Sequence, residues 1–287
     1  MPKNSNRLIL VTGATGQQGG AVLRKLRERG FSVRALTRDP SHEKARSLVG
    51  QGTEVVRGDL NDPTSLTRAL DGVDGVFSVQ NWQEGTETEI RQGKNLTDAA
   101  RRSRVSHLVY SSVGGADQNT GIPHFDSKWQ IEQHLRNSGV RFTVLRPVFF
   151  MENWLGMREA TERGTLELPL RPETTLQMIA VDDIGAFAAM AFEKPGRWHG
   201  ETREIAGDDL SMTGIAERLS RAGNEVRYHQ VPWDQWEQRT GRELTTMWRW
   251  FEEHGYHVDT AVVRQDYQQL TGFDRWLSLH WLLRRTA

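Results

Sequence analysis

The chain has 287 residues, of which 37% are hydrophobic and 26% are charged, as is typical of a globular protein with room for a nucleotide-binding domain and a smaller second domain. Lysine plus arginine and aspartate plus glutamate both number 37, so no net charge draws the chain to nucleic acid, and direct DNA binding is not expected. The absence of cysteine excludes disulfides, thiolate catalysis and thiolate metal sites.

No segment predicts membrane association. Residues 1–6 hold no apolar signal region, and no run reaches the roughly 18 apolar residues that a membrane span needs. The sequence therefore predicts a cytoplasmic protein with no membrane partner.

The first twenty residues hold the strongest motif. An apolar run over residues 7–11 leads into three glycines spaced G-x-x-G-x-x-G, and an apolar-periodic segment follows over residues 21–26. This order predicts a strand, a tight turn and a helix, with a diphosphate bound by backbone N–H groups at the positive end of the helix. Glycine-rich turns also occur for structural reasons alone, but this position near the N-terminus is that of a dinucleotide-binding unit. The expected contacts are Gly13, Thr15, Gly16, Gln17, Gln18 and Gly19.

A second strand over residues 31–36 ends at Thr37 and Arg38. The end of this strand contacts the adenine ribose in such folds, where an acidic residue binds the 2′-hydroxyl and an arginine pairs with a 2′-phosphate. Arg38 therefore favours NADP over NAD. The alternative is that Arg38 is an exposed loop charge and that Asp39 binds the ribose, which reverses the preference.

A third strand over residues 53–57 precedes Asp62 and Pro63, which predict a helix N-cap and the first helical position. A fourth strand over residues 72–79 follows, and the backbone at its end passes beside the central riboses of a bound dinucleotide. The expected contacts at that point are Val79, Gln80 and Asn81.

Strands over residues 105–110 and 140–145 complete six strands that alternate with helices. This alternation predicts an α/β protein with a Rossmann-type, doubly wound parallel sheet. We expect a dinucleotide-binding domain over residues 1–150 and a smaller, interleaved C-terminal α/β domain over residues 151–287, with residues 180–207 returning to the first domain. Regularity falls in the second part, where helices are expected over residues 213–222 and 273–283.

Several motifs together resemble the NmrA-like family of atypical short-chain dehydrogenase/reductases. The matching residues are 11–20, Thr37 with Arg38, Gly58 with Asp59, residues 124–128, Arg146 with Pro147, residues 150–153 and residues 181–183. The resemblance implies an NADP-binding fold whose members either reduce quinones and other conjugated compounds or bind NADP(H) as sensors that regulate partner proteins. It implies further cofactor contacts at Asp59, Leu60, Lys128, Pro147 and Phe149, although Asp59 is also a plausible turn residue.

The superfamily's catalytic Tyr-x-x-x-Lys is altered here, because His124 stands where the tyrosine belongs and Lys128 follows four residues later. That spacing places both side chains on one helix face. Lys128 can hold the nicotinamide ribose, and His124 can donate a proton to a developing oxyanion. The alternative for His124 is a residue that only begins the helix.

The superfamily also carries a serine or threonine at the end of the fifth strand, where it orients a substrate carbonyl. Ser112 is the expected residue, with Ser111 and Val113 as neighbours in an uncertain register. The missing tyrosine weakens ordinary alcohol dehydrogenation, whereas hydride transfer to an electron-poor acceptor such as a quinone needs less help from a general acid.

Aromatic residues are frequent around the expected mouth of the cleft. The expected substrate contacts are Trp82, Phe150, Asn153 and Trp154. A flat aromatic or conjugated substrate suits such a pocket, but the same aromatic residues, like Trp248 and Trp250, also suit a hydrophobic core, and Trp82 could simply cover the next helix. The close pair His254 and His257 has no cysteine to complete a tetrahedral site, so no metal is expected.

The sequence thus predicts an NADPH-dependent reductase of a conjugated or quinone-like small molecule. The alternative is a non-catalytic NADP(H) sensor that binds a partner protein.

Overall fold

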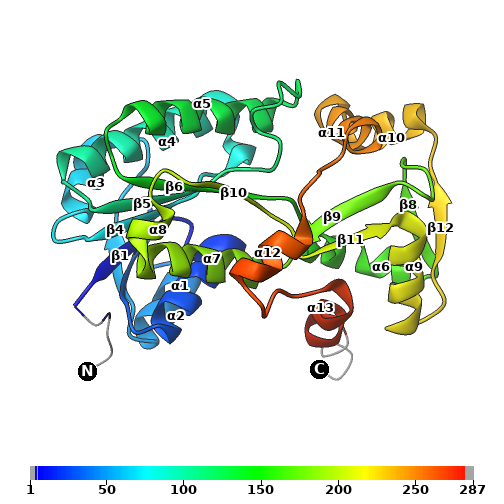
Figure 1. Ribbon diagram of the computed structural model, residues 1–287, viewed down its shortest axis with the longest axis horizontal. Coiled ribbons are helices and arrows are strands. Elements are labelled where there is room, and N and C mark those ends of the chain that lie inside the picture. Colours follow the sequence, from blue (N-terminus) through cyan, green and yellow to red (C-terminus); the bar gives the residue numbers. More distant parts are fainter. Residues whose placement is uncertain (1–3, 5, 282–287) are drawn as a thin grey trace. The chain divides into compact units, whose positions relative to one another are not determined.

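The computed structural model describes residue 4 and residues 6–281. Within them, a seven-stranded sheet has the order β10-β6-β5-β4-β1-β2-β3 (Figure 1). Its strands are β1 (Leu8–Val11), β2 (Ser32–Thr37), β3 (Glu54–Arg57), β4 (Gly75–Ser78), β5 (His107–Ser111), β6 (Phe142–Pro147) and β10 (Thr202–Ile205). The paired strands from β3 to β6 run parallel, and the order reverses between β1 and β4, as in the doubly wound fold expected from the sequence.

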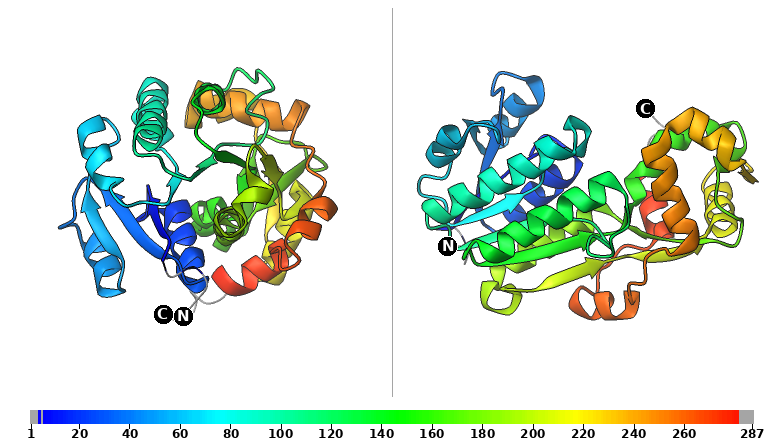
Figure 2. Two further views of the ribbon diagram at one scale, coloured as in Figure 1. Left: turned by 60° about the vertical axis from the view of Figure 1, so that its left-hand side comes forward. Right: turned by 90° about the horizontal axis from the view of Figure 1, so that it is seen from above.

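Helices cover both faces of this sheet (Figure 1). One face carries α3 (Pro63–Ala69), α4 (Thr86–Arg102) and α5 (Pro123–Asn137), and the other carries α1 (Gln17–Glu28), α2 (Glu43–Gly50) and α7 (Val181–Glu193). Helices α4 and α5 pack side by side along their length (Figure 2). Their close approach requires a glycine, because a Cβ at Gly93 would lie 2.7 Å from the Ile131 side chain.

The core of this sheet is built from strands that are buried on both faces. Leu10, Val76 and Leu108 are fully or almost fully buried beside Leu96 and Leu135 of the covering helices. Continuous apolar strands of this kind are characteristic of parallel sheets, because helices exclude water from both sides. This core fixes the positions of the strand ends, where the site residues lie.

The chain divides into two compact units. The first unit comprises residues 1–119, 123–146 and 184–203, and the second comprises residues 120–122, 147–183 and 204–287. The chain therefore leaves the first unit after residue 146 and returns to it at residue 184. The returning segment holds most of α7 and the start of β10. Short α8 (Pro195–Trp198) joins them.

The second unit holds two small sheets. One has the order β11-β9-β7, and the other pairs β12 with β8. The strands are β7 (Phe149–Phe150), β8 (Thr165–Leu168), β9 (Thr175–Ile179), β11 (Asp208–Ser211) and β12 (Arg227–Gln230). The helices are η2 (Met151–Met157), α6 (Arg158–Glu162), α9 (Met212–Arg221), α10 (Trp233–Thr240), α11 (Arg242–Glu253), α12 (Thr260–Asp266) and α13 (Phe273–His280). The helix expected over residues 273–283 is observed as α13, and residues 282 and 283 lie outside the described part of the chain.

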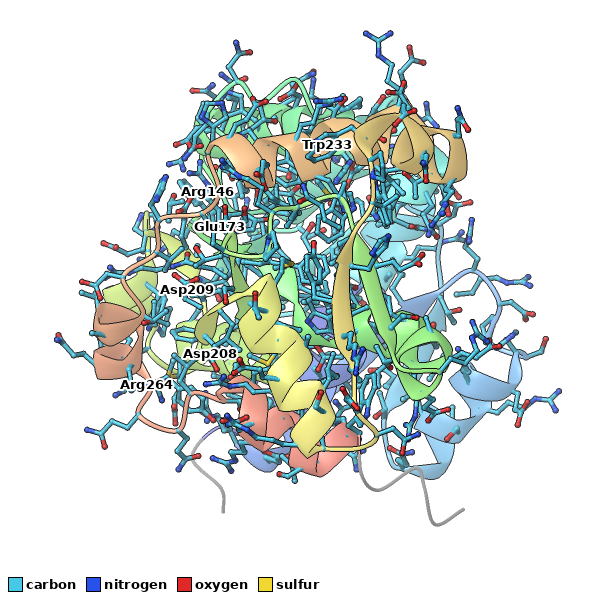
Figure 3. The ribbon with its side chains drawn as sticks, turned by 90° about the vertical axis from the view of Figure 1, so that its right-hand side faces the viewer. Arg146, Glu173, Asp208, Asp209, Trp233 and Arg264 are labelled. Carbon is cyan, nitrogen blue, oxygen red and sulfur yellow. The ribbon has the colours of Figure 1, made fainter. Side chains whose placement is uncertain are left out.

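Carboxylates fasten the segment before and within α13 to the rest of the second unit. Asp183 accepts hydrogen bonds from the Thr271 backbone N at 2.8 Å and from its Oγ1 at 3.2 Å, and Asp208 accepts one from the Phe273 backbone N at 2.7 Å. Glu152 accepts a hydrogen bond from Trp276 Nε1 at 2.9 Å. Arg264, labelled with Asp208 in Figure 3, donates to the Gly207 carbonyl. These bonds join residues that lie far apart in the sequence.

Burial affects two of these carboxylates. It raises the pKa of Asp183 to about 6, against the effect of the Thr271 hydrogen bonds, which favour the ionised form. Burial also raises the pKa of Glu152. Within residues 4 and 6–281, no helix is long and apolar enough to cross a membrane.

Candidate functional site

The glycine loop at the end of β1 has the geometry that a diphosphate requires. Gly13 has φ +61°, which favours glycine, and its carbonyl accepts a hydrogen bond from the Gly16 backbone N at 2.8 Å. A Cβ at Gly19 would lie 2.2 Å from the Gly13 oxygen, so only glycine lets α1 pack this closely against the loop. Gly16 immediately precedes α1, so the first-turn N–H groups begin at the loop.

Thr12 ties the loop to the end of β4. Its Oγ1 donates to the Val79 carbonyl at 2.9 Å, and the Val79 backbone N donates to that Oγ1 at 2.8 Å. The Val79 side chain fills the space where Gly13 would carry a Cβ, with Cγ1 at 2.9 Å. The expected contacts in the glycine loop and at the end of β4 therefore lie together. The sequence reasoning did not assign Thr12 this role, although the residue stands within the motif.

Gln80 offers a polar group at the same strand end. The residue is buried, and its Nε2 donates to Ser78 Oγ at 3.0 Å. Its Oε1 has no hydrogen-bond partner within the described part of the chain. A buried carbonyl oxygen without a donor is costly, and a ligand hydroxyl at this position would satisfy it. Asn81, by contrast, accepts from the Gln83 backbone N and caps the short helix η1 (Trp82–Glu84).

At the end of β2, Arg38 extends from the surface, with 67% of its side chain exposed, and forms an ion pair with Glu84 at 3.2 Å. Its neighbour Asp39 turns back into its own loop, where Oδ1 accepts from the Ser41 backbone N at 2.9 Å and from Ser41 Oγ. These hydrogen bonds lower the pKa of Asp39. The carboxylate named as the alternative ribose ligand is therefore already engaged by Ser41.

Asp59 follows β3 and organises the next turn. Its Oδ1 accepts from the Asn61 backbone N at 2.8 Å, and its backbone N donates to Ser65 Oγ at 3.0 Å. The Leu60 carbonyl accepts from Asn95 at 3.0 Å. Asp62 caps α3 by accepting from the Thr64 backbone N, as the sequence indicated. The Asp59 side chain thus stabilises this turn, and its contact with a bound cofactor stays a prediction.

His124 and Trp82 form one stack. Their ring centroids lie 4.9 Å apart with 29° between the planes, and the Phe125 ring lies nearly perpendicular to the His124 ring, with centroids 5.1 Å apart. His124 is buried, whereas Trp82 is 37% exposed and covers it. The structure thus brings together the expected proton donor and an expected substrate contact, which come from segments about forty residues apart.

Lys128 lies one helical turn after His124 and pairs with Glu89 of α4. The second oxygen of Glu89 accepts a hydrogen bond from Ser127 Oγ. Glu89 is fully buried, and Lys128 keeps 12% of its side chain exposed. A carboxylate held this firmly fixes the ammonium group of Lys128. Sequence reasoning missed Glu89, whose only signal is a charged residue on the buried face of α4.

The two serines at the end of β5 have different partners. Ser111 Oγ donates to Gln18 Oε1 at 2.6 Å and so connects this strand end to the first turn of α1. Ser112 Oγ donates to Glu132 Oε1 at 2.6 Å. Glu132 also accepts two hydrogen bonds from Arg146, from Nε and Nη2, both at 2.9 Å. The hydroxyl of Ser112 is thus committed to a buried ion pair, and its role toward a substrate carbonyl stays a prediction.

The remaining expected contacts belong to the second unit. Pro147 and Phe149 are buried, and Phe149 packs its ring against Trp154 and Trp248 with centroids 5.5 and 5.8 Å away. Trp154 is fully buried, and its Nε1 donates to Met178 Sδ at 3.0 Å. Phe150 is partly buried and Asn153 is exposed. Trp154, Trp248 and Trp250 therefore form core, the alternative that their sequence left open.

Residues 4 and 6–281 hold no group of three or more histidine, aspartate or glutamate side chains arranged to bind a metal ion. The glycine loop, the strand order and the polar groups at the ends of β1, β2 and β4 define instead a Rossmann-type dinucleotide-binding protein.

Comparison with known proteins places the chain within one group. The chain belongs to the NmrA-like family, whose model matches residues 5–277. An NAD(P)H azoreductase of Xenophilus azovorans is 34% identical over 230 residues, which cover 79% of this chain and 78% of that protein. An NADPH-dependent quinone oxidoreductase of Escherichia coli, solved with NADPH, matches with TM-score 0.81 and 25% identity over 95% of this chain and 99% of that chain. NmrA, a negative transcriptional regulator solved with NADP, matches with TM-score 0.80 and 23% identity, covering 95% and 94% of the two chains.

Proposed function

We propose that this chain is an NADPH-dependent reductase that transfers a hydride to a conjugated or quinone-like small molecule. The observation that carries the proposal is the grouping, within the first unit, of a glycine phosphate loop, a fixed lysine and a histidine stacked under a tryptophan. The names of the azoreductase and quinone oxidoreductase relatives agree with an electron-poor, conjugated acceptor.

The cofactor assignment rests on three features of the first unit. The loop Gly13–Gly19 and the N-terminus of α1 suit a diphosphate, and Gln80 Oε1 suits a ribose hydroxyl. Arg38 presents an exposed guanidinium for a 2′-phosphate, while Asp39 is engaged by Ser41. Bound NADPH supplies the hydride.

His124 is the proton donor in this proposal. A protonated imidazole can donate to an oxyanion that develops on the acceptor. Trp82, stacked on that ring and partly exposed, offers an apolar face to a flat acceptor. Lys128, held by Glu89, would donate a hydrogen bond to the nicotinamide ribose. This arrangement orients the reactants and leaves the demanding chemistry to the cofactor.

The test combines binding with turnover. Calorimetry with NADPH and NADH is followed, in the same sample, by NADPH absorbance during addition of quinones, azo dyes and enones. Tight NADPH binding with acceptor-dependent loss of absorbance is expected. The matched control is Gly16→Val, which should lose the cofactor, because its Cβ would lie 3.3 Å from the Gly13 oxygen and would displace the loop backbone by a few tenths of an ångström. Circular dichroism should show that the variant still folds. No oxidation above background with any acceptor would count against a reductase.

Two observations favour a second candidate, a non-catalytic NADP(H) sensor. The position of the superfamily's tyrosine carries His124, and the regulator NmrA is among the structures that match. A sensor should bind NADP and NADPH with different affinities and capture a partner protein in only one of the two states. Equal affinities with no partner captured in either state would argue against it.

A further inference from the structure

The turn between β4 and α4, residues Asn81–Gly85, connects two parts of the proposed cofactor site. Asn81 caps it, the Glu84 backbone N donates to the Asn81 carbonyl at 3.2 Å, and Gly85 closes it with φ +91°. The turn is therefore internally hydrogen-bonded. It carries Trp82, which stacks on His124, and Glu84, which pairs with Arg38.

The carboxylate of Glu84 is held from the protein side. Its Oε2 accepts from Gln92 Nε2 at 2.9 Å, and Gln92 is buried on α4. Its Oε1 lies 3.2 Å from Arg38 Nη1. Glu84 has 28% of its side chain exposed, against 67% for Arg38, so the glutamate is the anchored partner and the arginine the adaptable one.

We infer that Glu84 is a specificity residue that weakens the preference for NADP(H) over NAD(H) by competing with the 2′-phosphate for Arg38. This inference rests on the proposed NADPH site and assigns a residue that the sequence motifs did not include. A phosphate monoester carries between one and two negative charges at neutral pH and would meet the Glu84 carboxylate at the same guanidinium. Two anions on one cation repel each other, whereas an unphosphorylated ribose leaves the Arg38–Glu84 pair intact.

The competition has a second consequence within the turn. A 2′-phosphate that draws Arg38 away from Glu84 removes a contact from the segment that also carries Trp82. Glu84 and Trp82 belong to the same short helix η1, and Trp82 stacks on His124. Binding of the phosphate is therefore linked to the position of Trp82 over His124. NAD(H) has no 2′-phosphate, so it leaves the contact between Arg38 and Glu84 in place.

The test is calorimetry on the full chain with NADPH, NADH and 2′,5′-ADP, for the wild type and for Glu84→Gln. We expect Glu84→Gln to tighten NADPH and 2′,5′-ADP by about 3- to 10-fold and to leave NADH within about twofold, because an exposed charge repulsion is partly screened. The matched control is Glu87→Gln, which removes the same charge from an exposed position three residues away and should change neither cofactor by more than about twofold. In an Arg38→Ala background, the gain from Glu84→Gln should fall by more than half, because the arginine is the shared partner.

Equal tightening of NADPH and NADH would overturn the inference and would assign Glu84 to the stability of the turn. Weaker NADPH binding by Glu84→Gln would also overturn the inference, because it would show that Glu84 orients Arg38 for the phosphate rather than competing with it. A wild-type chain that binds neither dinucleotide would overturn the cofactor assignment and the inference together. Binding without turnover would count against the reductase and leave the inference standing.

Discussion

Two fully buried carboxylates of the first unit, Glu89 and Glu132, face cations, whereas Asp183 and Glu152 of the second unit face neutral N–H and O–H groups. In the first unit, Glu89 pairs with Lys128, and Glu132 pairs with Arg146 and Arg136. In the second unit, Asp183 accepts from Thr271, and Glu152 accepts from Trp276 Nε1 at 2.9 Å and from the Val181 backbone N at 3.0 Å. The same chemical group is thus built into the two units in two ways.

The difference teaches what each unit can tolerate. A cation beside a buried carboxylate offsets the loss of hydration, so removal of either partner leaves a buried charge uncompensated. Neutral donors offset less of that loss, and burial raises the pKa of Asp183 to about 6. The first unit should therefore be sensitive to neutralising substitutions, and the second should be sensitive to pH.

The largest effect is expected for Glu132→Gln. This change removes the bidentate carboxylate partner of the Arg146 guanidinium, which is 5% exposed and also pairs with Asp117 at 2.8 Å. We expect the free energy of unfolding to fall by about 3 kcal/mol, measured by urea denaturation at pH 7.5. Glu159→Gln, which breaks an exposed pair with Arg163, serves as the control and should change it by less than about 0.5 kcal/mol. Similar losses in the two variants would contradict the distinction between buried and exposed pairs.

A slightly smaller effect is expected for Glu89→Gln. Lys128 then loses its carboxylate but keeps some access to water, so the expected loss is about 2 kcal/mol. Lys128→Met combined with Glu89→Gln removes both charges and should recover much of that loss in a double-mutant cycle. Strictly additive losses would show that the two residues do not act as a pair.

Asp183→Asn tests the pH sensitivity of the second unit. The pKa of Asp183 in the folded chain, about 6, lies above its ordinary 3.8, so its favourable contribution is complete below pH 3.8 and is lost as the pH rises through 6. Wild type should therefore lose about 2 kcal/mol relative to Asp183→Asn between pH 4 and pH 7, measured by urea denaturation across that range.

The matched control for this pH series is Asp234→Asn, which removes an exposed carboxylate in the same unit. As a substitution at an exposed position, it should change the free energy of unfolding by less than about 0.5 kcal/mol. A difference between wild type and Asp183→Asn that stays constant with pH would contradict the burial argument.

The first unit could be predicted from the sequence because its signals are local. Apolar runs mark its buried strands, glycines mark the phosphate loop, and Asp62 with Pro63 marks the start of α3. The second unit gave weaker signals. Strands β8, β9 and β11 have four or five residues each, and β9 pairs with β11 some thirty residues away. Such short strands show no clear periodicity, and no hairpin turn motif joins them, so the sequence does not predict them.

The site divides in the same way. The glycine loop and the His124–Lys128 spacing are readable because each lies within one short segment. The roles of Glu89 and Glu84 could not be predicted, because their partners Lys128 and Arg38 are 39 and 46 residues away in the sequence. Helix packing brings the first pair together, and the turn after β4 brings the second pair together. A glutamate in a helix is ordinarily a solvated residue, and tertiary structure alone distinguishes the buried one.

The interrupted course of the chain through the first unit has a consequence for synthesis on the ribosome. Strand β6 ends at Pro147, but its neighbour β10 begins at Thr202, after residues 147–183 of the second unit have been made. At 5–20 residues per second, roughly 3 to 11 seconds pass between the synthesis of β6 and that of β10. Phe192 of α7, which packs over Gly75, is also made within this interval. During that interval β6 offers an unpaired edge, so nascent chains of this protein should need chaperone protection at this stage of translation.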